Sequence, residues 1–210
     1  MQNRKSLTLN DDAQASLPGN LDVQYLLWLR CFPREPLTYA AYLAGALLLA
    51  LFIGPLFWLP VALMLAVAVF SAIRIKEHFR SGCINPACVV SLNPPLIAAY
   101  TDLTTGRAPW PVVKVLPHPL HRMHGGAPAV GTRLVVVALY SGEMGKPHWD
   151  DFDPIVANCV TRNEAAIEKA FSRLSEENWS DLKIGLQQVP QPYKLGLYPV
   201  RVSSQNQTSP

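Results

Sequence analysis

The sequence predicts an α+β protein with a two-helix transmembrane hairpin followed by a small cytoplasmic domain. We expect five or six short strands in that domain, arranged as a partly open barrel or a curled sheet, with a C-terminal helical hairpin. Three observations lead to this prediction. A long uncharged segment comes first, short apolar runs separated by proline, glycine and asparagine follow it, and two segments of helical periodicity precede the C-terminus.

The composition excludes two classes of protein. Only 16% of the 210 residues are charged and 50% are hydrophobic, whereas soluble domains carry about a quarter charged residues. Low charge with high apolar content argues against a disordered chain. The net charge of +3 gives no support to a clustered basic surface, so we expect no nucleic acid partner.

The charge deficit is concentrated in residues 36–73, which contain no charged side chain. A membrane-spanning helix needs about 20 apolar residues, so two spans fit, at about 37–53 and 56–75. Gly54-Pro55 and Pro60 mark the break between them. A soluble buried hairpin is the alternative, but the rest of the chain is short for enclosing it. We assign 36–80 to the transmembrane hairpin.

Basic residues flank the hairpin, and its internal loop carries no charge. Positive charge favours the cytoplasmic side of a membrane. We therefore expect a multi-pass protein of the cell inner membrane with both termini cytoplasmic and the lipid bilayer as a partner. The first 20 residues are polar and do not resemble a cleavable signal peptide. The flanking basic residues are Arg30, Arg34, Arg74, Lys76 and Arg80.

The N-terminal part divides into a predicted disordered tail at 1–20 and an amphipathic juxtamembrane segment at 21–35. In the latter, apolar residues recur at helical spacing, and Asp22 is a candidate helix cap. This segment either lies in the membrane interface or packs against the soluble domain. The apolar residues are Leu21, Tyr25, Trp28, Leu29 and Phe32.

The soluble α+β domain is assigned to 81–202, followed by a disordered tail at 203–210. Strands are predicted at 87–91, 96–101, 112–116, 133–140, 155–160 and 197–202. The sequence from Thr161 to Glu164 has the pattern of a capping box for a first helix. Ser175 begins a second helix that ends before Pro190.

Three histidines, His118, His121 and His124, follow an H-x2-H-x2-H spacing. Imidazole is a common ligand for zinc, copper and nickel, so these residues are candidate metal ligands. Cys83, Cys88 or His148 are candidates to complete such a site. The alternative is an exposed loop rich in histidine, because Pro119 and Gly125-Gly126 interrupt the segment. We expect no cofactor.

The cysteines and a second cluster offer weaker candidates. A cytoplasmic location keeps thiols reduced, so no disulfide is expected, and Cys159 within an apolar run is expected to be inert. The segment 148–154 holds His148 followed by Asp150, Asp151 and Asp153, and these two or three carboxylates beside a histidine could support acid–base chemistry or bind a hard cation. Its alternative is a surface turn with solvated aspartates, anchored by inward-packing aromatic residues.

A resemblance adds to these observations. The run from His148 to Pro154, Trp179-x-x-Leu182, and Pro192-Tyr193-x-x-Gly196-Leu197-Tyr198 resemble an uncharacterised bacterial membrane-anchored family, a domain of unknown function, over residues 84–200. The resemblance implies a bacterial source and no activity.

We expect the domain to act as an interaction or regulatory module and not as an enzyme. One alternative is a metal-dependent sensor or enzyme that uses the histidines and cysteines. Another is a small subunit of a membrane complex, in which small residues spaced four apart contact a membrane-protein partner or a second copy of the chain.

Overall fold

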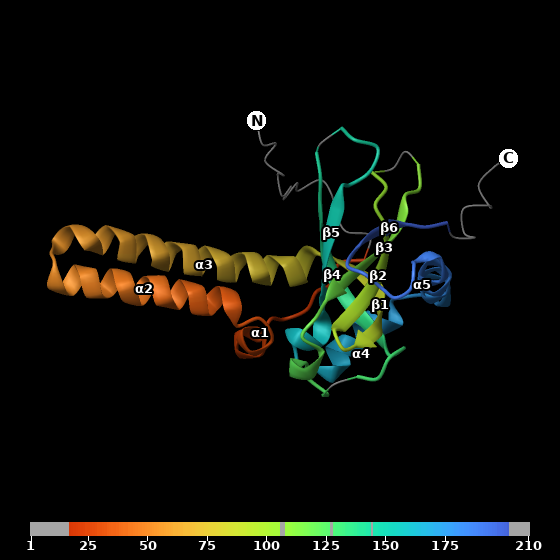
Figure 1. Ribbon diagram of the computed structural model, residues 1–210, viewed down its shortest axis with the longest axis horizontal. Coiled ribbons are helices and arrows are strands. Elements are labelled where there is room, and N and C mark those ends of the chain that lie inside the picture. The colour runs from red at the N-terminus through yellow and green to blue at the C-terminus, as the bar shows by residue number, and fades with distance from the viewer. Residues whose placement is uncertain (1–16, 106–107, 127, 144, 202–210) are drawn as a thin grey trace.

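Two long antiparallel helices project from one side of a six-stranded sheet (Figure 1). The computed structural model describes residues 17–105, 108–126, 128–143 and 145–201. Helix α2 spans Arg34–Phe52 and α3 spans Trp58–Ser81, with a 3-10 turn, η1, at Pro55–Phe57 between them. The predicted helical hairpin is confirmed, and α3 continues beyond the predicted end of the second span until Gly82 leaves the helical conformation.

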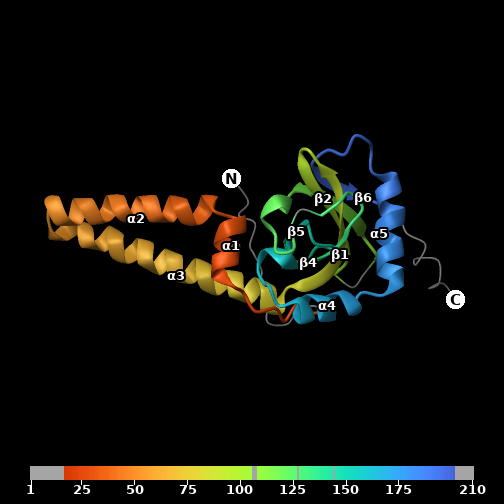
Figure 2. The same ribbon diagram turned by 90° about the horizontal axis from the view of Figure 1, so that it is seen from below.

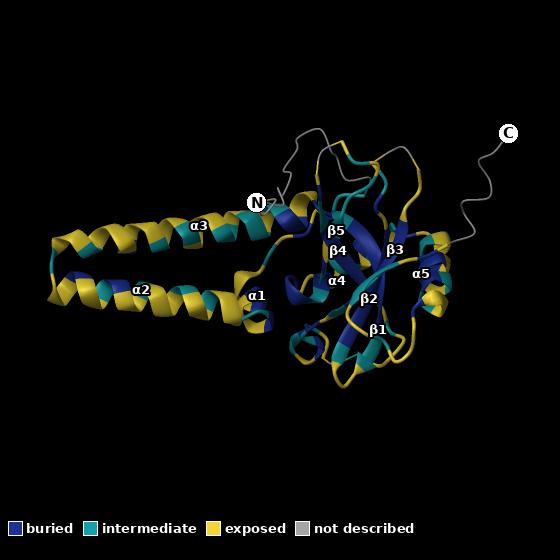
Figure 3. Ribbon diagram, turned by 45° about the horizontal axis from the view of Figure 1, so that its top comes forward, coloured by how far each residue is buried: buried dark blue, intermediate teal, exposed yellow. Residues whose placement is uncertain are grey.

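Most of the hairpin is exposed (Figure 3), and many of its exposed residues are large and apolar. Both helices are long and apolar enough to cross a membrane, and only 6% of each apolar window is buried. They contact each other through Ala46, Ala50 and Val61. Helices in the core of a soluble protein would be covered, so the alternative of a buried soluble hairpin does not describe this chain.

The sheet is antiparallel and curled into a half-barrel (Figure 2). Its order is β5-β4-β1-β2-β3-β6. Lys114 of β3 pairs with Asp151 of β5 at 2.9 Å, which links two strands that are not neighbours in the sheet. The six strands confirm the predicted curled α+β domain. Their bounds are Cys83–Leu92 (β1), Pro95–Asp102 (β2), Pro111–Pro117 (β3), Arg133–Ser141 (β4), Asp151–Val156 (β5) and Gly196–Pro199 (β6).

Both faces of the central strands are buried. Alternate residues such as Ala87 and Val136 belong to the core on the inner face, whereas Val113 and Val135 belong to the core beneath the C-terminal helices. Those helices are α4, Glu164–Ser172, and α5, Glu176–Gln188, and they cover the outer surface (Figure 2). Burial on both faces explains why β4 is continuously apolar and does not alternate.

The strand predicted at 155–160 is displaced. Strand β5 begins at Asp151 and ends at Val156, and residues Ala157–Cys159 form a 3-10 turn. Phe152 and Val156 are buried while Asp153 is exposed, so the aspartates belong to a strand that alternates in its burial. The cluster of acidic residues hid this alternation.

The predicted tail at 1–20 is too long. Residues 17–20 pair with the junction of α3 and β1, through bonds such as Gly19 N to Gly82 O at 2.8 Å. A Cβ atom on Gly82 would lie 2.4 Å from the carbonyl oxygen of His78, so glycine is needed for this close approach. Residues 1–16 and the tail predicted at 203–210 lie outside the described residues.

The two predicted helix caps, at Thr161 and Asp22, are wrong. Asn163, and not Thr161, caps α4 by accepting a hydrogen bond from the backbone N–H of Ala166 at 3.1 Å. The first helix, α1, spans Tyr25–Cys31 with Gln24 before it, so Asp22 is no cap. Ser175, the predicted start of the second helix, is the N-cap of α5 and forms a capping box with Asn178.

Replacing Ser175 with alanine is expected to lower the free energy of unfolding by about 1 kcal/mol, because the side chain satisfies an otherwise free N–H of the first turn. Chemical unfolding of the purified protein in detergent measures this loss. Ser180→Ala, an exposed position inside the same helix, is the matched control and should leave the stability unchanged or slightly higher. Equal losses in both variants would contradict the capping role.

Candidate functional site: the cavity between hairpin and domain

The short helix α1 joins the hairpin to the domain and lies across the base of the hairpin (Figure 2). Leu27 and Cys31 are part of the inner core of the sheet, and Trp28 packs against Phe79 of α3. The alternative in which this segment packs against the domain is therefore confirmed. Leu26 points the other way and is 82% exposed, so the helix also presents an apolar surface beside the hairpin.

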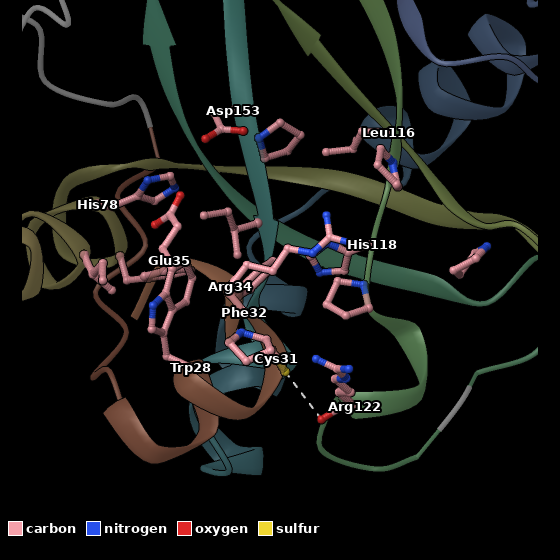
Figure 4. Close-up of a pocket in the computed structure, with 18 of the residues that line it drawn as sticks. Trp28, Cys31, Phe32, Arg34, Glu35, His78, Leu116, His118, Arg122 and Asp153 are labelled. Atoms are coloured by element: carbon pink, nitrogen blue, oxygen red, sulfur yellow. Dashed lines mark hydrogen bonds between the residues drawn. The ribbon is translucent and has the colours of Figure 1, made fainter. Parts of the chain in front are cut away.

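A cavity of about 970 Å³ lies beside α1, where the hairpin meets the domain. Figure 4 shows side chains from α1, both long helices and the sheet converging on it. Its walls are largely apolar, and they include Trp28, Phe32, Ile75, Leu116, Leu139 and Ile155. These residues come from five separate parts of the chain, so the site exists only when the hairpin and the domain are assembled.

Charged side chains of both signs line the cavity. Arg34, Arg74 and Arg122 supply positive charge, and Glu35 and Asp153 supply negative charge, which leaves an excess of one positive charge when the histidines are neutral. In Figure 4 the Arg34 side chain points toward His118, whereas Glu35 points toward His78. Within the described part of the chain, none of the five forms a salt bridge.

Two residues of the cavity wall, Cys31 and His118, meet the thiol of Cys159 behind it, and all three side chains are buried. The His118 Nε2 atom is 3.5 Å from the Cys159 Sγ. The hydrogen bond with Cys31 and burial raise the pKa of Cys159, and burial lowers the pKa of His118 to about 4. At neutral pH the imidazole is neutral and the Cys159 thiol is protonated, which agrees with an inert structural cysteine.

The three candidate metal ligands have different surroundings. His118 is buried, His121 is exposed beside Arg122, and His124 lies 3.6 Å from Glu164. Within residues 17–105, 108–126, 128–143 and 145–201, no group of three or more histidine, cysteine or acidic residues is placed to hold a metal ion. The metal hypothesis stays a prediction.

The residues proposed to complete that metal site are also dispersed. Cys83 is half-buried in β1, and Cys88 is buried beneath the C-terminal helices, where burial raises its pKa to about 11. His148 stacks on Trp110 with ring centres 4.3 Å apart. The structure instead brings His118 to Cys31 and Cys159, two cysteines far from it in sequence that no local spacing could have indicated.

The aspartates after His148 do not gather either. Asp150 pairs with Lys146 and Asp151 with Lys114, each at 2.9 Å. Asp153 alone reaches the cavity. The first two carboxylates thus hold loops and strands together, and the predicted inward packing of Phe152 is observed.

An exposed apolar hairpin, a half-barrel sheet and a charged cavity between them define a class, that of membrane-associated proteins with an α+β domain. Residues 71–190 match the family model described as protein of unknown function DUF3239. The chain belongs to this family, which confirms the resemblance to an uncharacterised family. The match runs from the last turns of α3 to the residues after α5.

Two further comparisons complete the picture. The crystal structure of a candidate membrane protein from Corynebacterium diphtheriae is similar, with a TM-score of 0.48 and 21% sequence identity. That similarity covers 56% of this chain and 99% of the other. No curated protein matches the sequence.

Proposed function

We propose that this protein is an integral protein of a bacterial inner membrane whose domain is an interaction or regulatory module on the cytoplasmic side. Helices α2 and α3 both cross the bilayer, and the cavity at their base is the binding site of the module. The observation that carries this proposal is the distribution of charge along the exposed apolar hairpin.

The two spans have matching lengths. The uncharged part of α2 is 36–52, or 17 residues, and that of η1 with α3 is 55–73, or 19 residues. At 1.5 Å per residue these spans are about 26–29 Å long, which is close to the hydrocarbon thickness. Arg34 begins α2 and Arg74 lies in the last third of α3, so in an antiparallel pair both fall at the same membrane surface. The η1 end is uncharged, and the basic end is expected to stay in the cytoplasm.

The cavity supports a binding role. Its volume lies within the range of about 300–1,000 Å³ that small-molecule sites occupy, and it combines apolar walls with a few charged groups, as such sites do. These charged side chains form no salt bridge among the described residues. A ligand can therefore provide the missing partner groups. A ligand there would contact the membrane hairpin and the domain together.

Cysteine labelling tests the topology. In cells that carry Leu56→Cys, at the exposed η1 turn, a membrane-impermeant maleimide is expected to label the protein from the periplasm. In Gln187→Cys, on the exposed surface of α5, labelling is expected only after the cells are lysed. The unsubstituted protein is the control, because three of its cysteines are buried and one is half-buried.

The pattern has clear contrary outcomes. Labelling of the α5 cysteine in intact cells would show that the domain is periplasmic. Protection of both cysteines in intact cells, with labelling of both after lysis, would show that the hairpin does not cross the membrane. Either result would overturn the proposed arrangement.

A further inference from the structure

We propose that the cavity between the hairpin and the domain binds the headgroup of an anionic phospholipid. Its phosphodiester lies beside Arg34 and Arg122, and its acyl chains follow the exposed surface of the hairpin. This inference rests on the proposed function, because it requires the base of the hairpin to lie at the membrane surface. The chemistry recognised is that of a phosphate ester anion attached to an apolar tail.

The charges favour an anion at one end of the cavity. Guanidinium groups bind phosphate oxygens with two parallel hydrogen bonds, and Arg34 points into the cavity toward His118 (Figure 4). Glu35 points toward His78, away from that end. A phosphate is thus expected where Arg34 points and not beside Glu35, and no described salt bridge competes for Arg34.

Arg122 is the second candidate for the phosphate. Its side chain lines the same cavity and is half-buried, and it already donates weak bonds to the carbonyl oxygen of Arg30 at 3.4 Å and to the ring of His121 at 3.1 Å. These bonds hold the guanidinium in place and leave part of its donor capacity for a ligand.

The apolar walls favour an amphiphile over a free phosphate ion. Trp28, Phe32 and Ile75 line the cavity, and apolar side chains continue from it along the helices that form its floor. Leu37, one turn beyond Arg34, is 65% exposed, and Ile73, next to Arg74, is 59% exposed. An inorganic anion gains no binding free energy from these apolar surfaces, whereas an acyl chain would bury them favourably.

The test is native mass spectrometry of the full chain in a neutral detergent, with dioleoyl phosphatidylglycerol as the probe. Dioleoyl phosphatidylcholine provides the zwitterionic comparison, and inorganic phosphate is added as a competitor. We expect one phosphatidylglycerol to bind roughly tenfold more tightly than phosphatidylcholine, with a hundredfold excess of phosphate failing to displace it. Replacing Arg34 with glutamine should weaken binding by roughly tenfold, the equivalent of one charge-assisted hydrogen bond.

Matched variants distinguish a specific lipid site from non-specific electrostatic attraction to an anionic lipid. Lys76 is an exposed basic residue on α3 that does not line the cavity, so Lys76→Gln should leave the affinity for phosphatidylglycerol unchanged. Arg122→Gln should weaken binding as Arg34→Gln does. Equal losses in the Lys76 and Arg34 variants, equal affinity for the two lipids, or displacement by phosphate would each overturn the inference. Because the measurement is made in detergent, its failure beside a normal cysteine-labelling pattern would overturn the lipid site and leave the topology standing.

Discussion

Replacing Phe79 with alanine is expected to lower the free energy of unfolding by about 3–5 kcal/mol, the usual cost of removing a large buried aromatic side chain. Phe79 is fully buried near the end of α3. It packs on Trp28 of α1 at a ring distance of 6.2 Å and shares a core with Val137 and Val160. Urea unfolding of the detergent-solubilised protein, followed by tryptophan fluorescence, measures the loss.

Phe70 provides the control on the same helix. It lies in the uncharged part of α3 and is 59% exposed, so Phe70→Ala removes few contacts within the chain and is expected to cost less than about 1 kcal/mol. A loss for Phe79→Ala no larger than that of Phe70→Ala would show that the end of α3 is not part of the core of the domain.

The core around Phe79 and Val137 joins the hairpin to the sheet. Helix α3 passes directly into β1 through Gly82, where a Cβ atom would lie 2.8 Å from Val137 of β4 as well as against His78. His78 also bonds through Nε2 to the carbonyl oxygen of Val137 at 2.9 Å. With so little free space, a movement of α3 is expected to carry the centre of the sheet with it.

The sequence was sufficient for the hairpin and for most strands, because both signals are local. A stretch without charge has few structures open to it other than a membrane helix, and runs such as 134–138 are long enough to mark a central strand. The strand pattern misled the prediction at β5, where polar residues lie within a strand. Asp151 and Asp153 have the composition of a turn, yet they belong to β5, where Lys114 offsets one of the two charges.

The candidate site was beyond the reach of sequence analysis for a different reason. Its walls come from segments that are distant along the chain, and no spacing rule connects Trp28, Arg122 and Asp153. Arg34 and Arg74 were recognised, but as markers of membrane orientation. That they also line a cavity depends on the packing of α1, whose buried and exposed faces only the assembled structure distinguishes.

The stability of the protein is expected to fall as the pH decreases from 6.5 to 4, and His118 is expected to contribute about 3 kcal/mol of that loss. Burial lowers the pKa of His118 from 6.5 to about 4. Between these values the unfolded chain binds a proton at this residue and the folded chain does not. The contribution of His118 is therefore complete above pH 6.5 and is lost as the pH falls toward 4, at about 1.4 kcal/mol for each pH unit.

His118→Phe isolates this contribution, because it keeps a ring against Phe32, whose centre lies 5.6 Å away, and removes the titrating group. Urea unfolding at pH 7.5, 6.5, 5.5 and 4.5 should show a shallower fall for this variant than for the unsubstituted protein. The exposed His121 serves as the control, and His121→Gln should keep the original slope. Parallel curves for all three proteins would mean that His118 binds a proton equally well in the folded and the unfolded chain. That would require water to reach the ring from the adjoining cavity.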